Sequence, residues 1–169
     1  DEKQTFIYDI CVMPDIPEEM SAAFFRLSPD ITEVTEEMIP LEVRCDIESL
    51  KLPEGVISIE DATFADCHSL SSIDLPFGLQ TIGGFAFGRC YALSSMNLPD
   101  GLQVIDEEAF KYCRSLKRIE LPDRLQQIGR RAFTGCTALE EIVAPLSFMG
   151  KDADYWRFVG KPDHTSVVC

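Results

Sequence analysis

Seven cysteines are the residues of this chain best suited to chemistry, because a thiolate is a nucleophile, a metal ligand and half of a disulfide. Four of them recur every 23 residues, unlike the closely spaced CxxC pairs of a zinc site. Side chains that repeat at one position of a coil point the same way, which suits the torsion of a disulfide poorly. The spacing therefore predicts a structural ladder of buried, reduced thiols at Cys67, Cys90, Cys113 and Cys136.

Other candidates for catalysis or metal binding are few. Cys67 and His68 form one conceivable nucleophile pair, but adjacent residues of an extended coil point to opposite sides, so we expect Cys67 inside and His68 on the surface. The chain has no GxSxG, HExxH or phosphate-loop motif, and its acidic residues do not recur by column as in calcium-binding β-rolls. The sequence thus predicts no catalytic residue, no metal site and no cofactor, and a protein that is not an enzyme.

Three cysteines lie outside the ladder, namely Cys11, Cys45 and Cys169. Because the total number is odd, at least one thiol is free or pairs with another molecule. A pairing of Cys11 stays open, and the ladder alone does not decide the redox compartment of the protein.

Internal repeats are the elements that must position the ladder. Four consecutive segments of 23 residues begin at Leu52, Leu75, Leu98 and Leu121, without insertion or deletion. Their apolar columns repeat while the residues between them are polar and vary, which is typical of coils that bury apolar side chains only against their neighbours. Two of the columns are Ile59, Ile82, Ile105 and Ile128, and Phe64, Phe87, Phe110 and Phe133.

The spacing within one repeat predicts the local elements. Alternating apolar residues over 70–75 predict a short strand, and the Leu-Pro pair that follows ends it because proline lacks an N–H for the ladder. Residues 79–82 predict a second short strand on the opposite face. Apolar residues at positions 109, 110 and 113 predict one to two turns of helix between Asp106 and Cys113. We expect the strands of successive coils to form a parallel sheet.

These columns resemble the BspA-like leucine-rich repeat family, whose repeat reads LPxxLxxIgxxAFxxCxxLxxIx. All four repeats over 52–143 match, with local departures such as Glu60, Thr63, Asp106 and Arg124. The resemblance implies a right-handed, curved repeat solenoid with parallel strands on the concave face and short strands and helical turns on the other. It also implies a secreted protein of the bacterial cell surface that takes part in adhesion, and it carries no catalytic residues.

We expect atypical segments at both ends, because an open solenoid would expose its core. Residues 1–51 are expected to form an N-terminal cap, with a strand over 6–12, a helix over 17–27 and a degenerate first repeat over 27–51. Residues 52–143 hold the four repeats, and residues 144–169 are expected to form the C-terminal cap. Thr165 to Val168 predict a last short strand. Four aromatic residues are available to cover the last coil: Phe148, Tyr155, Trp156 and Phe158.

The net charge of −14 argues against nucleic acid or an anionic membrane surface as a partner, because like charges repel. Most of the acidic excess falls within residues 1–50, which we interpret as a solvated flank, with an acidic docking surface as the alternative. No stretch reaches the roughly 20 apolar residues that a membrane helix needs, so we expect no membrane insertion. The chain begins with Asp1, and we expect an extracellular or cell-surface protein whose signal or anchor has been removed.

The outward positions of the concave strands form the candidate binding strip. Its first two coils carry small, mostly uncharged side chains, the third is basic and the fourth is acidic, which favours a protein partner recognised by charge. One alternative is a structural spacer or assembly domain without a ligand. Another is a carbohydrate-binding surface, with Tyr91 and Tyr112 as the nearest aromatic candidates. The oligomeric state stays open. The binding strip comprises Ser71, Ser72, Asp74, Ser94, Ser95, Asn97, Lys117, Arg118, Glu120, Glu140 and Glu141.

Overall fold

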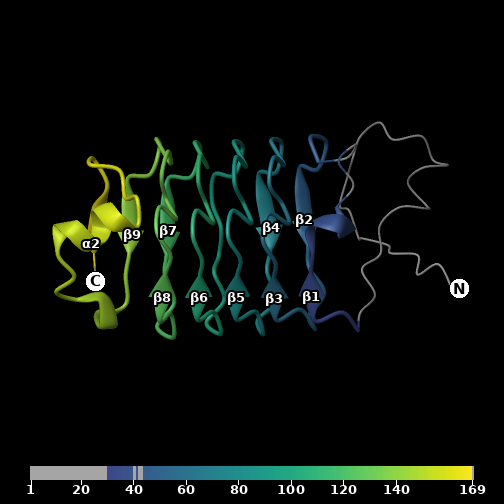
Figure 1. The fold of residues 1–169 in the computed structure, drawn as a ribbon, viewed down its shortest axis with the longest axis horizontal. Helices are drawn as coiled ribbons and strands as arrows, with labels where there is room; N and C mark the ends of the chain where they lie inside the picture. Colours follow the sequence, from purple (N-terminus) through teal and green to yellow (C-terminus); the bar gives the residue numbers. More distant parts are fainter. Residues whose placement is uncertain (1–29, 40, 42–43, 169) are drawn as a thin grey trace, which may run out of the picture.

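The chain winds into a solenoid of parallel strands stacked along one axis (Figure 1). A computed structural model describes residues 30–39, 41 and 44–168. The strand expected over 6–12 and the helix expected over 17–27 lie outside these residues. None of the helices in the described part is long and apolar enough to cross a membrane.

One side of the solenoid carries a five-stranded parallel sheet, the β1–β8 face. Each strand contributes a β-branched residue that points inward, such as Ile59, which is paired in register with Ile82. Val34 pairs with Ile59 in the same way, so the strand that contains Val34 joins the stack. The strands are β1 (Glu33–Val34), β3 (Ser58–Ile59), β5 (Thr81–Ile82), β6 (Val104–Ile105) and β8 (Gln127–Ile128). A short 3-10 helix, η1 (Glu36–Met38), follows β1.

The strands of the other side, the β2–β10 face, form two separate sheets instead of the continuous one that we expected. β2 (Ser49–Lys51) pairs with β4 (Ser72–Asp74), and β7 (Arg118–Glu120) pairs with β9 (Glu141–Val143), which pairs with β10 (Ser166–Val168). The coil between β4 and β7 has no named strand on this face. Within the described residues, a single β-bridge joins its Asn97 to Glu120 of β7. The interrupted stretch is Ser-Ser-Met-Asn, and serine and asparagine bond their own backbone and favour strands poorly. β10 confirms the predicted last strand.

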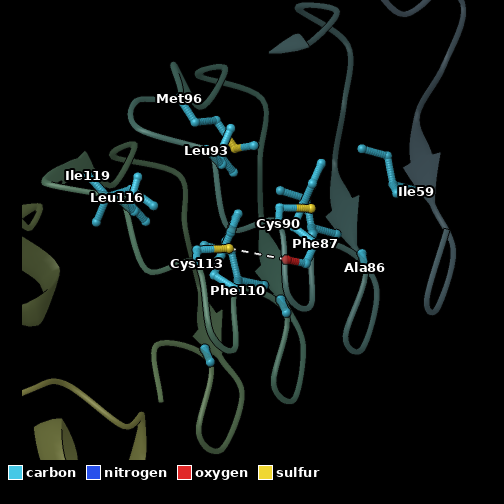
Figure 2. Close-up of a cluster of buried hydrophobic side chains, with 14 of the residues drawn as sticks. Ile59, Ala86, Phe87, Cys90, Leu93, Met96, Phe110, Cys113, Leu116 and Ile119 are labelled. Carbon is cyan, nitrogen blue, oxygen red and sulfur yellow. Dashed lines mark hydrogen bonds between the residues drawn. The ribbon is translucent and has the colours of Figure 1, made fainter. Parts of the chain in front are cut away.

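The core between the two faces is a column of stacked phenylalanine rings. Phe64, Phe87, Phe110 and Phe133 are fully buried, and their successive ring centroids are 5.3, 5.5 and 5.8 Å apart. Successive rings are inclined by no more than 16°. Figure 2 shows Phe87 and Phe110 in the same buried cluster as Leu93, Leu116 and Ile119. The equal coils and their shared apolar axis are therefore confirmed.

The helical turns predicted between Asp106 and Cys113 are wrong. The segment forms consecutive turns, with Glu108 and Tyr112 in the left-handed region at φ 59° and 63°. The N–H groups of Glu108, Phe110 and Tyr112 donate to carbonyl groups of the next coil, at 2.8–2.9 Å. Because every second N–H points along the solenoid axis, the segment cannot close the hydrogen bonds of an α-helix.

The C-terminal segment takes up backbone groups that the last repeat would otherwise leave open. After a 3-10 helix, η2 (Leu146–Phe148), the helix α2 (Ala153–Phe158) begins behind its N-cap Asp152. The N–H groups of Arg131 and Phe133 donate to the carbonyl groups of Phe158 and Val159 at 2.8 and 3.0 Å. Of the four aromatic residues expected to cover the last coil, Phe148 and Trp156 are buried, Tyr155 is half-buried and Phe158 is 51% exposed. The boundaries at residues 51 and 143 stay a prediction.

Candidate functional site

The four ladder cysteines lie in one fully buried column, and none of them forms a disulfide. The thiols of Cys90, Cys113 and Cys136 donate to the carbonyl oxygens of Phe64, Phe87 and Phe110, at 3.1–3.2 Å. Each acceptor belongs to the preceding coil, and Figure 2 shows the contact between Cys113 and Phe87. The column therefore joins neighbouring coils through sulfur-to-backbone hydrogen bonds.

Burial makes these thiols poor nucleophiles. It raises the pKa of Cys67 to about 12, although the nearby Arg44 guanidinium acts in the opposite direction. Burial also raises the pKa of Cys136 to about 12, and it raises the pKa of Cys90 and Cys113 well above the ordinary value. Since the thiolate is the reactive form, the ladder offers no nucleophile at neutral pH.

Arg44 occupies the position of the ladder cysteine in the coil before Cys67, and sequence reasoning missed this residue. It stands one repeat length before Cys67 and is 4% exposed. Its guanidinium donates to the carbonyl oxygens of Ile39, Ala65 and Glu36 at 3.0–3.1 Å, and it lies 3.4 Å from the Glu36 carboxylate. The N–H groups of a buried arginine thus satisfy the carbonyls where the first coil departs from the repeat. The spacing to Cys67 was the signal that would have identified this residue.

Replacing Arg44 by methionine keeps the aliphatic stem and removes every donor. The buried carbonyl oxygens of Ile39 and Ala65 then lose the arginine donor, while that of Glu36 keeps the Ile39 N–H, so we expect the free energy of unfolding to fall by about 2 kcal/mol. Urea titration followed by circular dichroism measures this change. Arg130→Met, at an exposed position, is the control and is expected to stay within about 0.5 kcal/mol of the wild type. Equal effects of the two substitutions would contradict the role assigned to Arg44.

The binding strip lies along the β2–β10 face, on both sides of a buried row. The residues of that row are Ile73, Met96, Ile119 and Ile142, from four successive coils. The strip residues beside them are exposed, apart from Glu141, which is partly covered. One side chain of the strip is held by the backbone of the preceding coil, since the Ser71 hydroxyl donates to the Glu48 carbonyl at 2.9 Å.

Arg118 and Lys117, the basic pair of the strip, differ in their surroundings. Arg118 donates to the Glu141 carboxylate on the paired strand at 2.6 Å and to Glu120 on its own strand at 3.2 Å. The hydrogen bond to Glu141 is the main reason why the pKa of Arg118 is raised. Within the described part of the chain, no ion pair includes Lys117. Lys117 therefore carries the available positive charge of the strip.

The aromatic candidates Tyr91 and Tyr112 do not lie on the strip. Both of them lie in turns of their coils. The guanidinium of Arg114 lies 5.0 Å from the ring of Tyr91 and 5.9 Å from the ring of Tyr112. Both tyrosines are partly exposed. Their arrangement is a cation–π cluster and not a row of aromatic platforms along the strands.

His68 also lies in a turn, next to Tyr91, and its side chain contacts Cys45 instead of Cys67. The Cys45 sulfur is 3.8 Å from Nδ1 of His68, and a carboxylate oxygen of Asp66 is 3.4 Å from Nε2. The imidazole ring stacks on Tyr91 with its centroid 4.8 Å away. As expected, His68 is at the surface. In the part of the chain that the structure describes, no group of three or more His, Cys, Asp or Glu side chains is arranged to hold a metal ion.

Comparison with known proteins identifies the repeat. Residues 43–153 match a family model described as BspA type leucine rich repeat region, in six copies. Among solved structures, the chain is similar to the T. pallidum leucine-rich repeat protein, with 32% sequence identity and a TM-score of 0.66. It is also similar to the pneumococcal vaccine antigen PcpA, with 30% identity and a TM-score of 0.56. A comparison with curated proteins gave no match.

A third similar structure is a leucine-rich cell surface protein from Faecalibacterium prausnitzii, with 28% identity and a TM-score of 0.57. The matched part covers 69% of this chain and 35% of that one. The T. pallidum match covers 69% of this chain and 54% of its own, and the PcpA match covers 58% and 24%. The chain thus spans about half the length of the first relative and about a quarter of the second.

Proposed function

Because the chain belongs to the BspA-type leucine-rich repeat family, we propose that it is a non-catalytic module that binds a protein partner at or outside the cell surface. The binding strip is the proposed contact surface. The observation that supports it is the contrast between a repetitive core and varied outward residues on the same strands. The buried row is Ile, Met, Ile and Ile, while its exposed neighbours change from serine to lysine and arginine to glutamate.

The charge distribution along the strip supports a partner with a complementary pattern. Lys117 offers a positive charge beside the Arg118–Glu141 ion pair, and Glu140 adds a negative charge in the following coil. Charges of both signs at short range suit a protein surface better than a polyanion. Extracellular location is part of the same proposal, and the description of the Faecalibacterium prausnitzii protein as a cell surface protein supports it.

The test is capture of a partner from a surface-protein extract, followed by affinity measurement with the purified partner. Lys117→Glu is expected to weaken binding at least about fivefold, which corresponds to about 1 kcal/mol. Arg130→Glu changes the charge by the same amount at an exposed position away from the strip, and it is expected to leave the affinity unchanged. Equal loss in the two variants would mean that net charge, and not the strip, governs binding.

The second candidate is a structural spacer without a ligand of its own. It is favoured by the length of the relatives, since the matched part is only 24% of PcpA and 35% of the Faecalibacterium prausnitzii protein. Failure to capture any partner with the wild-type chain would favour this spacer over the binding module.

A further inference from the structure

Cys45, His68 and Asp66 form a cluster that neither the repeat nor the proposed binding strip requires. Cys45 is exposed, in contrast to the four buried ladder thiols. It stands one repeat length before His68, so stacking of the coils brings the two side chains together, with 3.8 Å between Sγ and Nδ1. The contact therefore depends on the solenoid and is absent from an unfolded chain.

Three contacts hold the imidazole of His68 in one orientation. Its face stacks on the Tyr91 ring, with 11° between the planes. Its Nε2 lies 3.4 Å from a carboxylate oxygen of Asp66, and its Nδ1 faces Cys45. A carboxylate beside Nε2 favours the tautomer with its proton on that nitrogen, and this tautomer has its lone pair on Nδ1, the nitrogen next to the thiol. A base held in this way by a third group is the arrangement that activates a cysteine nucleophile.

Asp66 is itself fixed by a neighbouring coil. The Arg89 guanidinium donates to its two carboxylate oxygens at 3.1 and 3.4 Å. The side chain of His68 is 42% exposed and that of Asp66 is 44% exposed, so a small molecule can approach the cluster from solvent. The contacts order the groups without closing them off.

From this geometry we propose that Cys45 is a reactive thiol that undergoes exchange with low-molecular-weight disulfides. His68 accepts the thiol proton through Nδ1, and the sulfur of Cys45 attacks one sulfur of the small disulfide. The disulfide bond of the reagent breaks as a new one forms to Cys45. The leaving thiolate then takes the proton from His68. One disulfide is consumed and one is formed, so no further oxidant is required.

The test is the rate of mixed-disulfide formation with oxidised glutathione at pH 7, in a chain where Cys11 and Cys169 are replaced by serine. Peptide mass mapping assigns the modified residue. We expect modification at Cys45 and none at the ladder cysteines, whose protection also reports that the chain is folded. His68→Phe keeps a ring to stack on Tyr91 and removes the base, so we expect the rate at Cys45 to fall at least about tenfold.

A second variant keeps the result interpretable. His68→Asn removes the base without an aromatic ring and is expected to give the same loss as His68→Phe. A loss smaller than about tenfold in a variant whose ladder thiols stay protected would overturn the proposal. So would modification of a ladder thiol in preference to Cys45 in the folded wild type.

Asp66 is a positioning residue, and its role is tested by the tautomer of His68. Asp66→Asn suits the left-handed backbone at φ 63°, but an amide can present either its carbonyl or its NH₂ group to Nε2. We expect nitrogen NMR to show less of the Nε2–H tautomer in this variant, together with slower exchange at Cys45. An unchanged tautomer would rule out this role for Asp66.

Discussion

Phe110→Ala is expected to lower the free energy of unfolding by about 3–5 kcal/mol, because it removes the middle of the ring column. Phe110 is fully buried between the rings of Phe87 and Phe133, whose centroids lie 5.5 and 5.8 Å away. Its loss leaves a cavity that neighbouring coils cannot close without shifting their own columns. Urea titration followed by circular dichroism, with the fluorescence of Trp156 as a second probe, measures the change.

The matched control for this prediction is Phe77→Ala, because Phe77 is 72% exposed. An exposed ring loses little contact on truncation, so we expect a change within about 0.5 kcal/mol. If Phe110→Ala lowered the stability by less than about 1 kcal/mol, the stacked column would not carry the stability that we assign to it.

The free energy of unfolding is expected to fall steeply from about pH 9 upward, because the ladder thiols lose their protons more readily in the unfolded chain. Burial raises the pKa of Cys67 and Cys136 to about 12 in the folded state. A raised folded-state pKa gives stability that is complete below the unfolded-state pKa of about 8.5 and is lost as the pH rises toward the folded-state value. The loss reaches about 2 kcal/mol per thiol at pH 10. Urea titrations at several pH values, with a reductant present, measure this dependence.

Cys113→Ser tests the same prediction at one position of the ladder. Serine has no titrating group in this range and its hydroxyl can donate to the Phe87 carbonyl, which accepts from Cys113 in the wild type. We expect the pH-dependent loss between pH 7 and 10 to shrink by about 2 kcal/mol. Ile119→Val lowers stability without removing a titrating group, so its curve should run parallel to that of the wild type. A parallel curve for Cys113→Ser as well would refute the role of the thiol.

The sequence predicted the coil, the two strand positions and the inward columns, because each of these depends on apolar side chains that recur at one spacing. Ile59 and Phe64, for instance, were expected to lie inside and are fully buried. The 23-residue period carries this information without any knowledge of the backbone conformation.

The turns between Asp106 and Cys113 were mistaken for helix for a physical reason. Apolar residues at positions 109, 110 and 113 fit a helical spacing, and Glu108 is intrinsically a good helix former. The backbone at Glu108 nevertheless has φ 59°, a conformation that the sequence marks with no glycine. Hydrogen bonds to the next coil hold it there, and such bonds between coils leave no trace in the local sequence.

The groups around Cys45 and Arg44 were missed because their neighbours come from other coils. Arg44 contacts Ala65, and Cys45 contacts His68, at separations of 21 and 23 residues. Both residues stand in a degenerate repeat, where the columns are hard to align by eye. Continuing the 23-residue spacing backwards from Cys67 and His68 would have paired each of them with its structural neighbour.

The hydrogen bonds that join each coil to its neighbours have a consequence for how this chain can change length. The turns of each coil donate N–H groups to the coil after it, whereas residues such as Gly83 and Gly129 donate to the coil before it. Phe158 and Val159 accept the N–H groups that the turns of the last repeat donate. Duplication or deletion of one complete 23-residue unit would leave both terminal segments and their contacts as they are. Each added unit would lengthen the molecule by about 4.8 Å, so its reach can evolve in steps while its two ends stay fixed.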